Sequence, residues 1–359
     1  MPERIGRYRV IRALGEGHFG AVWLAEGEVP AKGARSARSR WVAIKQLRGE
    51  WTMRAFETLV REFELLDRVK HRSLCRVYEF LDRECAVVME YVEGNTLRQV
   101  LDAYAEGGEP VWPDAAYEIG CEIADCLYQA HATTGVNGEP LLLVHRDVKP
   151  ENVMLTPTGE VKLLDFGLAR IDDGVRDVGP KGTPLYMAPE QARGEGVEHR
   201  TDLFALGLVV FELLTGRPAY PIPTRDRDSE IEALMGRVQR ADLGAELAAL
   251  RRTAPDAADA LARCLAPRPA DRPEDGHAVM LELRRRVERR GALAEFAAYT
   301  FGPLGPLTTK GVGAAVARAS PRAKLGHPSS GSTGGPAGPV ADMMSRPSEP
   351  EPAPTMSKP

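Results

Sequence analysis

The chain has 359 residues, of which 43% are hydrophobic and 27% are charged, and its formal net charge is −4. This length allows two domains, or one domain of two lobes with extensions, and the composition is typical of a chain that buries a large core. A small negative net charge does not favour a nucleic-acid or membrane-surface partner, so we expect no nucleic-acid binding.

The five cysteines argue against a zinc site or a disulfide framework, because their number is odd and no CxxC pair occurs. We expect buried thiols in a reducing compartment. The N-terminus lacks the apolar stretch of a secretory signal, and no segment approaches the roughly 18 apolar residues that cross a bilayer. The sequence therefore predicts a cytoplasmic protein without a membrane span.

The pattern of the first 92 residues predicts mainly β-strands and one helix. Short alternating or apolar runs predict strands at residues 8–11, 21–24, 41–46, 77–80 and 86–91. Apolar residues at helical spacing predict a helix over 56–69. A small sheet with one main helix is therefore expected at the N-terminus.

The periodicity becomes helical after residue 97. We predict helices at 115–132, 201–215 and 256–265, and an apolar strand at 141–144. Residues 297–359 contain many Pro, Gly and Ser and few aromatic residues, with eleven prolines from Pro303 onward. Such a segment buries too little apolar surface to offset its ordering entropy, so it is predicted to be a disordered tail.

Glycines between the first two strands fit the pattern G-x-G-x-x-G-x-V, from Gly15 through Gly17 and Gly20 to Val22. Glycines let the backbone approach phosphate groups and offer them N–H donors. A strand follows rather than a helix, which favours a hairpin lid over a dinucleotide-binding turn. The next strand carries Lys45 among apolar residues, where an ammonium needs phosphate oxygens or a carboxylate as partner. Glu62 is the best candidate for that carboxylate, and Glu57 and Glu64 are alternatives.

The segment from His145 to Asn152 reads HRDVKPEN and concentrates groups that serve phosphoryl transfer. Asp147 can accept the proton of a substrate hydroxyl, Lys149 can neutralise phosphoryl charge, and Asn152 can ligate a metal ion. Asp165 follows in the sequence DFG, and a carboxylate beside phosphate oxygens suits Mg²⁺. The tripeptide Ala188-Pro189-Glu190 follows, and its Glu190 comes 25 residues after Asp165. A single tripeptide means little, but the segment from His145 to Asn152 is much more specific, and the ordered set at these intervals is very unlikely to arise by chance.

These motifs together resemble the eukaryotic-type protein kinase family, and especially its bacterial serine/threonine branch. The resemblance covers roughly residues 8–288. It implies an α+β, bilobal fold: an N-lobe at residues 8–92 with an antiparallel sheet and one main helix, and a mostly helical C-lobe at 93–288. It also implies ATP and Mg²⁺ as cofactors and proteins with Ser or Thr hydroxyls as substrates.

The resemblance assigns roles to individual residues. Lys45 would pair with Glu62 and with the α- and β-phosphates, Asp147 would be the catalytic base, and Asn152 with Asp165 would hold Mg²⁺. Met89 matches the gatekeeper, and Glu90 to Val92 match the hinge that hydrogen-bonds adenine. The residues expected around the nucleotide are Gly15, Gly17, Gly20, Val22, Ala43, Lys45, Met89, Glu90, Val92 and Met154.

Two further pairings follow from the same resemblance. Glu190 would pair with Arg272, and Asp202 would brace the segment around Asp147. Lys149, two residues after Asp147, resembles the serine/threonine pattern rather than the tyrosine pattern.

Two other functions compete with that of an active protein kinase. The first is a nucleotide-binding pseudokinase scaffold, and the second is a small-molecule phosphotransferase. The intact set of catalytic residues favours an enzyme over the scaffold, and the Ala188-Pro189-Glu190 segment favours a protein substrate. The resemblance implies a role in bacterial signalling, and tail residues such as Ser329 and Ser330 are expected to be autophosphorylated because they are tethered to the enzyme.

Overall fold

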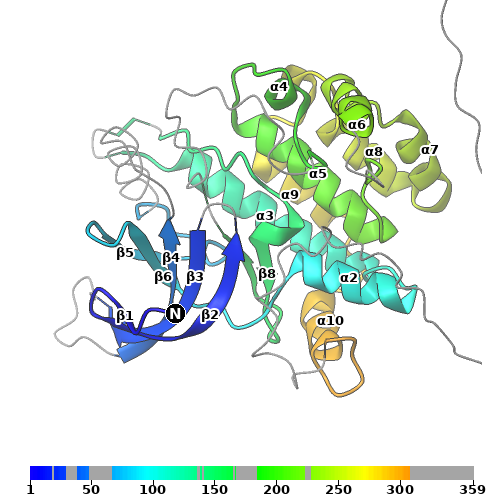
Figure 1. Cartoon of the computed structure of the whole chain (residues 1–359). Helices are drawn as coiled ribbons and strands as arrows, with labels where there is room; N and C mark the ends of the chain where they lie inside the picture. Colours follow the sequence, from blue (N-terminus) through cyan, green and yellow to red (C-terminus); the bar gives the residue numbers. More distant parts are fainter. Residues whose placement is uncertain are drawn as a thin grey trace, which may run out of the picture. The chain divides into compact units, whose positions relative to one another are not determined.

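The computed structural model describes residues 1–17, 20–29, 39–47, 67–135, 138–139, 141–164, 166, 184–222 and 228–307. The N-terminal part is a six-stranded antiparallel sheet with the strand order β1-β2-β3-β4-β6-β5 (Figure 1). Its strands are β1 (Arg4–Ile5), β2 (Tyr8–Gly17), β3 (Gly20–Glu28), β4 (Ser39–Leu47), β5 (Val77–Leu81) and β6 (Ala86–Glu90). The predicted N-terminal sheet is confirmed, while the helix predicted over 56–69 lies almost wholly outside the described residues.

The two faces of this sheet belong to different apolar clusters. Val42 and Ile44 of β4 pack in one cluster, whereas Ala43 packs in the other. Because side chains alternate along a strand, Lys45 points to the same face as Ala43. The sheet therefore presents Ala43 and Lys45 together, on the side where it meets a residue of the helical part, Met154.

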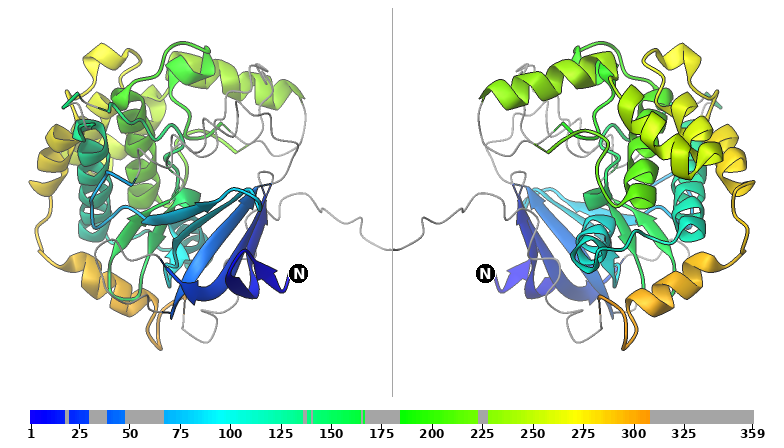
Figure 2. Two further views of the ribbon diagram at one scale, coloured as in Figure 1. Left: turned by 90° about the vertical axis from the view of Figure 1, so that its left-hand side faces the viewer. Right: turned by 90° about the vertical axis from the view of Figure 1, so that its right-hand side faces the viewer.

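The C-terminal part is mostly helical and lies beside the sheet (Figure 2). Its α-helices are α2 (Leu97–Gly107), α3 (Pro113–Ala132), α4 (Pro189–Ala192), α5 (His199–Thr215), α6 (Asp228–Arg240), α7 (Gly244–Thr253), α8 (Pro255–Cys264), α9 (Gly276–Arg284) and α10 (Ala292–Thr300). A three-stranded sheet of β7 (Asn95–Thr96), β8 (Val153–Leu155) and β9 (Val161–Leu163) and the 3₁₀ turns η1 (Pro150–Asn152) and η2 (Pro269–Asp271) complete it. This arrangement confirms the predicted α+β fold.

Helix α5 is the centre of the helical part. Every residue from Thr201 to Leu213 is buried, including Asp202 and Glu212. A helix that is apolar on all sides needs neighbours all round. Helices α3 and α8 pack against it, so α5 is a fixed support for the loops that reach its ends.

The strand predicted at residues 141–144 is not formed. Leu142 has a positive φ of 50° and is 57% exposed, which is incompatible with a buried strand. The prediction failed because four apolar residues in a row indicate burial only when neighbouring elements cover them.

The predicted tail begins too early at residue 297. Residues 292–300 form helix α10, and Phe296, Ala297 and Thr300 are fully buried. The Phe296 ring lies 5.2 Å from that of Tyr104 and 5.6 Å from that of Trp112. The prediction was wrong here because composition averaged over a long segment conceals one short helix. Residues 308–359 of the predicted tail lie outside the described residues.

Within the described ranges, no helix combines the length and the apolar character that a membrane crossing requires. Helix α3 has 20 residues, but it carries charged residues such as Asp114, Glu118 and Glu122.

We expect Phe296→Ala to lower the free energy of unfolding by about 3–5 kcal/mol, since it leaves a cavity between Tyr104 and Trp112. Tyr299→Ala on the same helix is the control, because Tyr299 is 41% exposed and should cost clearly less. Urea unfolding of the variants measures both values. Equal, small losses would show that α10 does not contribute to the core.

Candidate active site

A buried carboxylate holds the loop that carries Asp147. Asp202, in the first turn of α5, accepts the backbone N–H groups of His145 and Arg146, each at 2.7 Å. Burial raises the pKa of Asp202 to about 7, although the two donors favour the charged form. Arg146 takes a positive φ of 68°, a conformation that costs free energy in a residue other than glycine. Asp202 stabilises this turn, so the brace expected for this residue is present.

The His145 side chain ties the same loop to Leu164, the residue that follows β9. Its Nδ1 lies 3.2 Å from the backbone N–H of Asp147, and its Nε2 lies 2.8 Å from the carbonyl oxygen of Leu164. Nδ1 accepts a hydrogen bond from the Asp147 N–H and so bears no hydrogen, which places the ring hydrogen on Nε2, the donor to Leu164. The ring also packs edge-on against Phe166, at 4.6 Å between centroids. The imidazole thus joins the loop to the segment around residue 165.

Asp147, Lys149 and Asn152 form one polar cluster. Lys149 Nζ donates to the two carboxylate oxygens of Asp147, at 2.9 and 2.7 Å. Asn152 Nδ2 donates to the carbonyl oxygen and to Oδ2 of Asp147, both at 2.8 Å. The Asp147 side chain is 40% exposed, so a hydroxyl from solvent or substrate can reach it. The cluster thus fixes the orientation of the Asp147 carboxylate next to the Lys149 ammonium group and leaves the carboxylate accessible.

Asn152 also has the chemistry of a cation ligand. It is 8% exposed and uses its amide nitrogen on Asp147, which leaves Oδ1 without a donor among the described residues. An amide oxygen beside a carboxylate is a typical ligand for Mg²⁺. The second predicted ligand, Asp165, lies outside the described residues, as does Glu62, so the pairing of Lys45 with Glu62 stays a prediction.

A cluster of packed apolar side chains, which we call the apolar slot, is shared by the sheet and the helical part. Ala43, Met89 and Val92 from the N-terminal part pack in one cluster with Met154 of β8, and Val22 packs against it. The five apolar residues expected around adenine therefore lie together. Their role toward a nucleotide stays a prediction.

Lys45 and the glycines border this slot. Lys45 is 8% exposed and pairs in register with Val22 of β3 and Val87 of β6. Gly15 pairs with Val22, and Gly17 pairs with Gly20 at the end of the hairpin. The residues of the glycine pattern thus lie along the strands that carry Val22 and Lys45, although His18 and Phe19 lie outside the described residues.

The side chain of Glu90 is engaged elsewhere. Lys162 Nζ of β9 donates to both of its carboxylate oxygens, at 3.0 and 3.2 Å, and the backbone N–H of Arg76 donates at 3.2 Å. The backbone N–H of Glu90 also donates to the carbonyl oxygen of Arg76 at 2.8 Å, and the Cys75 thiol lies 3.5 Å from the Glu90 carbonyl oxygen. The carboxylate and the backbone N–H of Glu90 are therefore both engaged within the protein. Sequence analysis missed the Lys162 contact, because these residues are 72 positions apart and neither belongs to a short polar motif.

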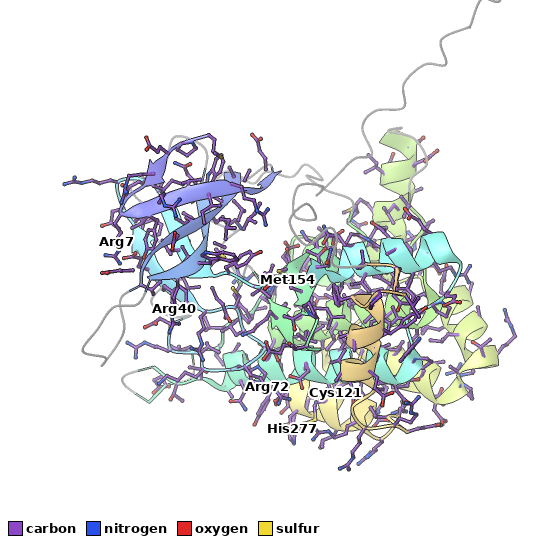
Figure 3. The ribbon with its side chains drawn as sticks, turned by 90° about the horizontal axis from the view of Figure 1, so that it is seen from below. Arg7, Arg40, Arg72, Cys121, Met154 and His277 are labelled. Carbon is purple, nitrogen blue, oxygen red and sulfur yellow. The ribbon has the colours of Figure 1, made fainter. Side chains whose placement is uncertain are left out.

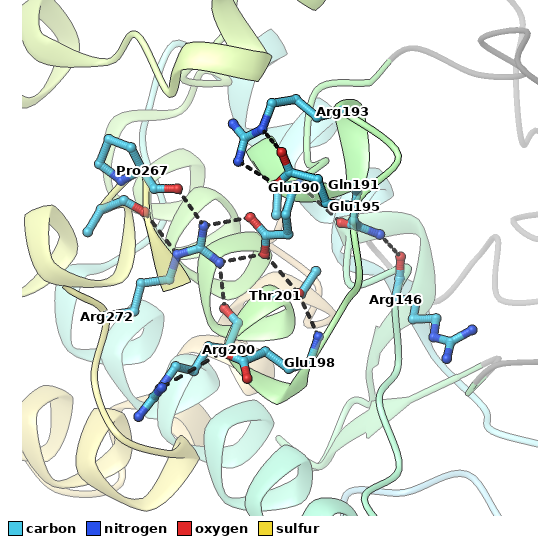
Figure 4. Close-up of polar contacts among 12 residues, drawn as sticks. Arg146, Glu190, Gln191, Arg193, Glu195, Glu198, Arg200, Thr201, Pro267 and Arg272 are labelled. Atoms are coloured by element: carbon cyan, nitrogen blue, oxygen red, sulfur yellow. Dashed lines mark hydrogen bonds and ion pairs between the residues drawn. The ribbon is translucent and has the colours of Figure 1, made fainter. Parts of the chain in front are cut away.

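A buried ion pair links Glu190 to Arg272 (Figure 4). Arg272 donates to the two carboxylate oxygens at 2.7 and 2.8 Å, and both side chains are at most 2% exposed. Thr201 adds a donor at 2.8 Å, and Arg272 also donates to backbone carbonyls, including those of Arg200 and Pro267. Burial raises the pKa of Glu190, but the donors and the charge of Arg272 outweigh it and hold that pKa below its usual range. The predicted pair is confirmed.

A second charged network was not predicted. Arg98 of α2 donates to Glu212 of α5 at 2.7 Å, and the Tyr186 hydroxyl donates to the other oxygen of the same carboxylate. Glu212 is fully buried, and burial raises the pKa of Tyr186. The network attaches the segment before α4 to α5. The sequence signal was a lone glutamate inside an apolar helix, which demands a partner but does not identify it.

Comparisons with known proteins agree with this geometry. Residues 8–282 match the family described as "Protein kinase domain". Serine/threonine-protein kinase PksC of Streptomyces coelicolor is 34% identical over 281 residues, which cover 74% of this chain and 46% of that protein. Serine/threonine-protein kinase PknB of Mycobacterium tuberculosis is 35% identical over 228 residues, covering 60% of this chain and 33% of that protein. The chain thus spans less than half the length of these relatives.

A solved structure gives the same result for the fold. The crystal structure of the Mycobacterium tuberculosis PknI kinase domain aligns with a TM-score of 0.51 at 27% sequence identity. The alignment covers 79% of this chain and 97% of that one. The similarity therefore extends over nearly the whole of that domain.

We expect Arg272→Ala to lower the free energy of unfolding by about 3–5 kcal/mol, because Glu190 would be buried without its cationic partner. Arg193→Ala is the matched control, since it breaks the solvent-exposed pair with Glu195 and should change stability little. Urea unfolding at neutral pH measures both. A loss at Arg272 no larger than that at Arg193 would contradict the assignment.

The Glu190 pair also makes stability depend on pH. Because the pKa of Glu190 is lower in the folded than in the unfolded chain, its contribution is complete above the unfolded-state pKa and is lost as pH falls through the folded-state pKa. The stability difference between wild type and Glu190→Gln should therefore stay constant from about pH 7 to about pH 5 and shrink on further acidification from about pH 5 to about pH 3. Urea unfolding of both proteins across this range tests it, and a constant difference would be inconsistent with the shift.

Proposed function

Because the chain belongs to the protein kinase family, we propose that it is an active enzyme that transfers the γ-phosphoryl group of ATP to serine or threonine hydroxyls of other proteins. The observation that carries the proposal is the Asp147 carboxylate, which Lys149 and Asn152 hold in place while it stays accessible. The serine/threonine class is supported by Lys149 and by the printed names of the relatives.

The described residues divide the work of the reaction. Asp147 orients the acceptor hydroxyl and takes its proton as the oxygen attacks the γ-phosphorus and the bond to the β-phosphate oxygen breaks. Lys149 stabilises the negative charge on the transferring group. The apolar slot between Ala43 and Met154 accepts the adenine. The kinase resemblance assigns its hydrogen bonds to the backbone from Glu90 to Val92, where the Glu90 carbonyl oxygen would take part because the Glu90 N–H is bonded to Arg76.

A divalent cation fits the residues that are described. Asn152 Oδ1 would be one ligand and Asp165, by sequence, the other. When bound, Mg²⁺ supplies charge compensation for the phosphate oxygens. The protein contributes the orientation of Asn152, which its two bonds to Asp147 maintain.

The second candidate function is a pseudokinase that binds nucleotide without transferring phosphate. The only observation that supports this candidate is the apolar slot, because a scaffold protein could use the same residues to bind adenine. We further propose a cytoplasmic protein that acts in bacterial signalling and phosphorylates its own tail, which rests on the relatives and on the hydroxyl-rich sequence after residue 308.

We expect Asp147→Asn to reduce phosphoryl transfer by about 10²–10⁴-fold, because it removes the general base. Transfer of labelled phosphate from ATP and Mg²⁺ to a generic protein acceptor measures the rate. Asp259→Asn, which changes an exposed carboxylate of α8, is the control and should retain full activity.

Nucleotide binding separates the two candidate functions. Binding measured by calorimetry should be similar in wild type and in Asp147→Asn. A wild-type protein that binds ATP but phosphorylates no acceptor, itself included, would favour the pseudokinase scaffold.

A further inference from the structure

Two imidazole rings join the end of α3 to the start of α5. His131 lies in the last turn of α3 and His199 is the first residue of α5, and their rings stack with 4.1 Å between centroids. His199 Nε2 lies 2.8 Å from the carbonyl oxygen of Glu274, so this nitrogen carries a hydrogen and donates to that oxygen. Asp202, which holds the loop of Asp147, lies in the same first turn of α5 as His199. The stack therefore connects α3 to the turn that carries the brace of the active site.

A small cavity is bordered by the stack and by Asp202. Its volume is about 10 Å³, and its lining includes His131, His199, Asp202 and Asp275. A space of this size is at the lower limit for a single water molecule, so a charge on His131 would be hydrated far less there than in bulk water. Nδ1 of His131 is buried and has no hydrogen-bond partner in the described part of the chain. With both ring nitrogens protonated, His131 would therefore present a buried N–H donor without an acceptor.

The charged and titratable groups around the stack come from three elements. Those of α3, of α5 and of the residue that caps α9 are Tyr128, Glu198, Arg200, Asp202 and Asp275. Asp275 accepts a backbone N–H at 2.8 Å at the start of α9, and Glu198 lies 3.7 Å from Arg200 in an ion pair. Burial and the neighbouring His199 lower the pKa of His131, and they outweigh the two carboxylates, which act in the opposite direction. The neutral imidazole is thus the form that this site favours.

We propose that the stacked pair positions Asp202 and makes phosphoryl transfer depend on pH. While His131 is neutral, the stack holds the first turn of α5 against α3. Both rings are only partly buried, so a charged His131 turns outward to water and the stack is lost. Asp202 then no longer fixes the backbone at His145, and the carboxylate of Asp147 loses its orientation. Neither imidazole touches the reacting groups, so both are positioning residues, and the proposal rests on the proposed function only for its effect on the rate.

The direction of the pH effect follows from the lowered pKa of His131. The stack is complete above the pKa of an unperturbed imidazole, about 6.5, and is lost as pH falls through the lower pKa of the folded protein. Asp202 also titrates in this range, since burial raises its pKa to about 7. This second titration is common to the wild type and to variants of the histidine, so their comparison isolates the contribution of His131.

An NMR titration of the full chain from about pH 8 to about pH 5 tests the coupling without reference to activity. We expect the ring resonances of His131 to titrate below about pH 6.5, and the backbone amides of His145 and Arg146 to show a shift with the same midpoint. In His131→Phe, which keeps an aromatic ring against His199 but has no titratable group, that component of the amide shifts should be absent. Amide shifts whose midpoint is unrelated to that of His131 would overturn the proposal.

Phosphoryl transfer gives the second measurement. Between about pH 7.5 and about pH 5.5, the rate of the wild type should fall at least about threefold more than that of His131→Phe. His277→Phe is the matched control, because His277 is an exposed histidine of α9 whose ring lies against Tyr128 and outside the stack. Figure 3 labels His277 at the periphery of the helical part. This control should keep the pH dependence of the wild type.

Thermal unfolding at neutral pH verifies that each variant is folded. A His131→Phe variant with the full pH dependence of the wild type, or a His277→Phe variant that loses it equally, would contradict the proposal. A wild type that transfers no phosphate at any pH would instead contradict the proposed function. In that case the NMR titration of the wild type still decides whether His131 controls the loop at His145.

Discussion

The contact on which the active site depends is the pair of hydrogen bonds from the backbone of His145 and Arg146 to the buried carboxylate of Asp202. The bonds lie where water does not compete, so they are stronger than hydrogen bonds exposed to solvent. They stabilise the strained turn at Arg146 and thereby set the direction in which Asp147 leaves the loop. Asp202 belongs to the buried helix α5. The loop that carries Asp147 is therefore attached to the core of the helical part and not to an element at its surface.

A second constraint joins the sheet to the helical part. Lys162 of β9 pairs with Glu90 at the end of β6, close to the apolar slot in which Met154 meets Ala43 and Met89. The slot is completed only when both parts are in place, because each contributes side chains to the same cluster. The Glu90 pair thus orients the residues that border the slot as well as linking the two parts.

Buried charge in the helical part follows one pattern, in which each charged group is satisfied by several partners. Arg272 donates to Glu190 and to backbone carbonyls, and Glu212 accepts from Arg98 and Tyr186. Such groups contribute little net stability against an apolar alternative, yet removing one partner leaves an uncompensated charge. The contacts attach α2 and α4 to α5, and Gln191 of α4 donates to the carbonyl oxygen of Arg146 in the loop that carries Asp147.

The amino-acid sequence by itself determined the antiparallel sheet, the helical second part and the short-range cluster of Asp147, Lys149 and Asn152. Residue periodicity and close spacing along the chain are local properties, and local hydrogen bonds such as those of Asn152 follow from them. The kinase resemblance, and not spacing, supplied the pairings of Glu190 with Arg272 and of Asp202 with the loop at His145.

Only the tertiary structure decided the contacts between distant segments. It placed Lys162 on Glu90, joined Arg98 to Glu212, and packed Phe296 of α10 between Tyr104 and Trp112. It also left residues 141–144 outside any strand. The physical reason is that burial and charge pairing depend on which surfaces meet after the chain has folded, and neither periodicity nor composition contains that information.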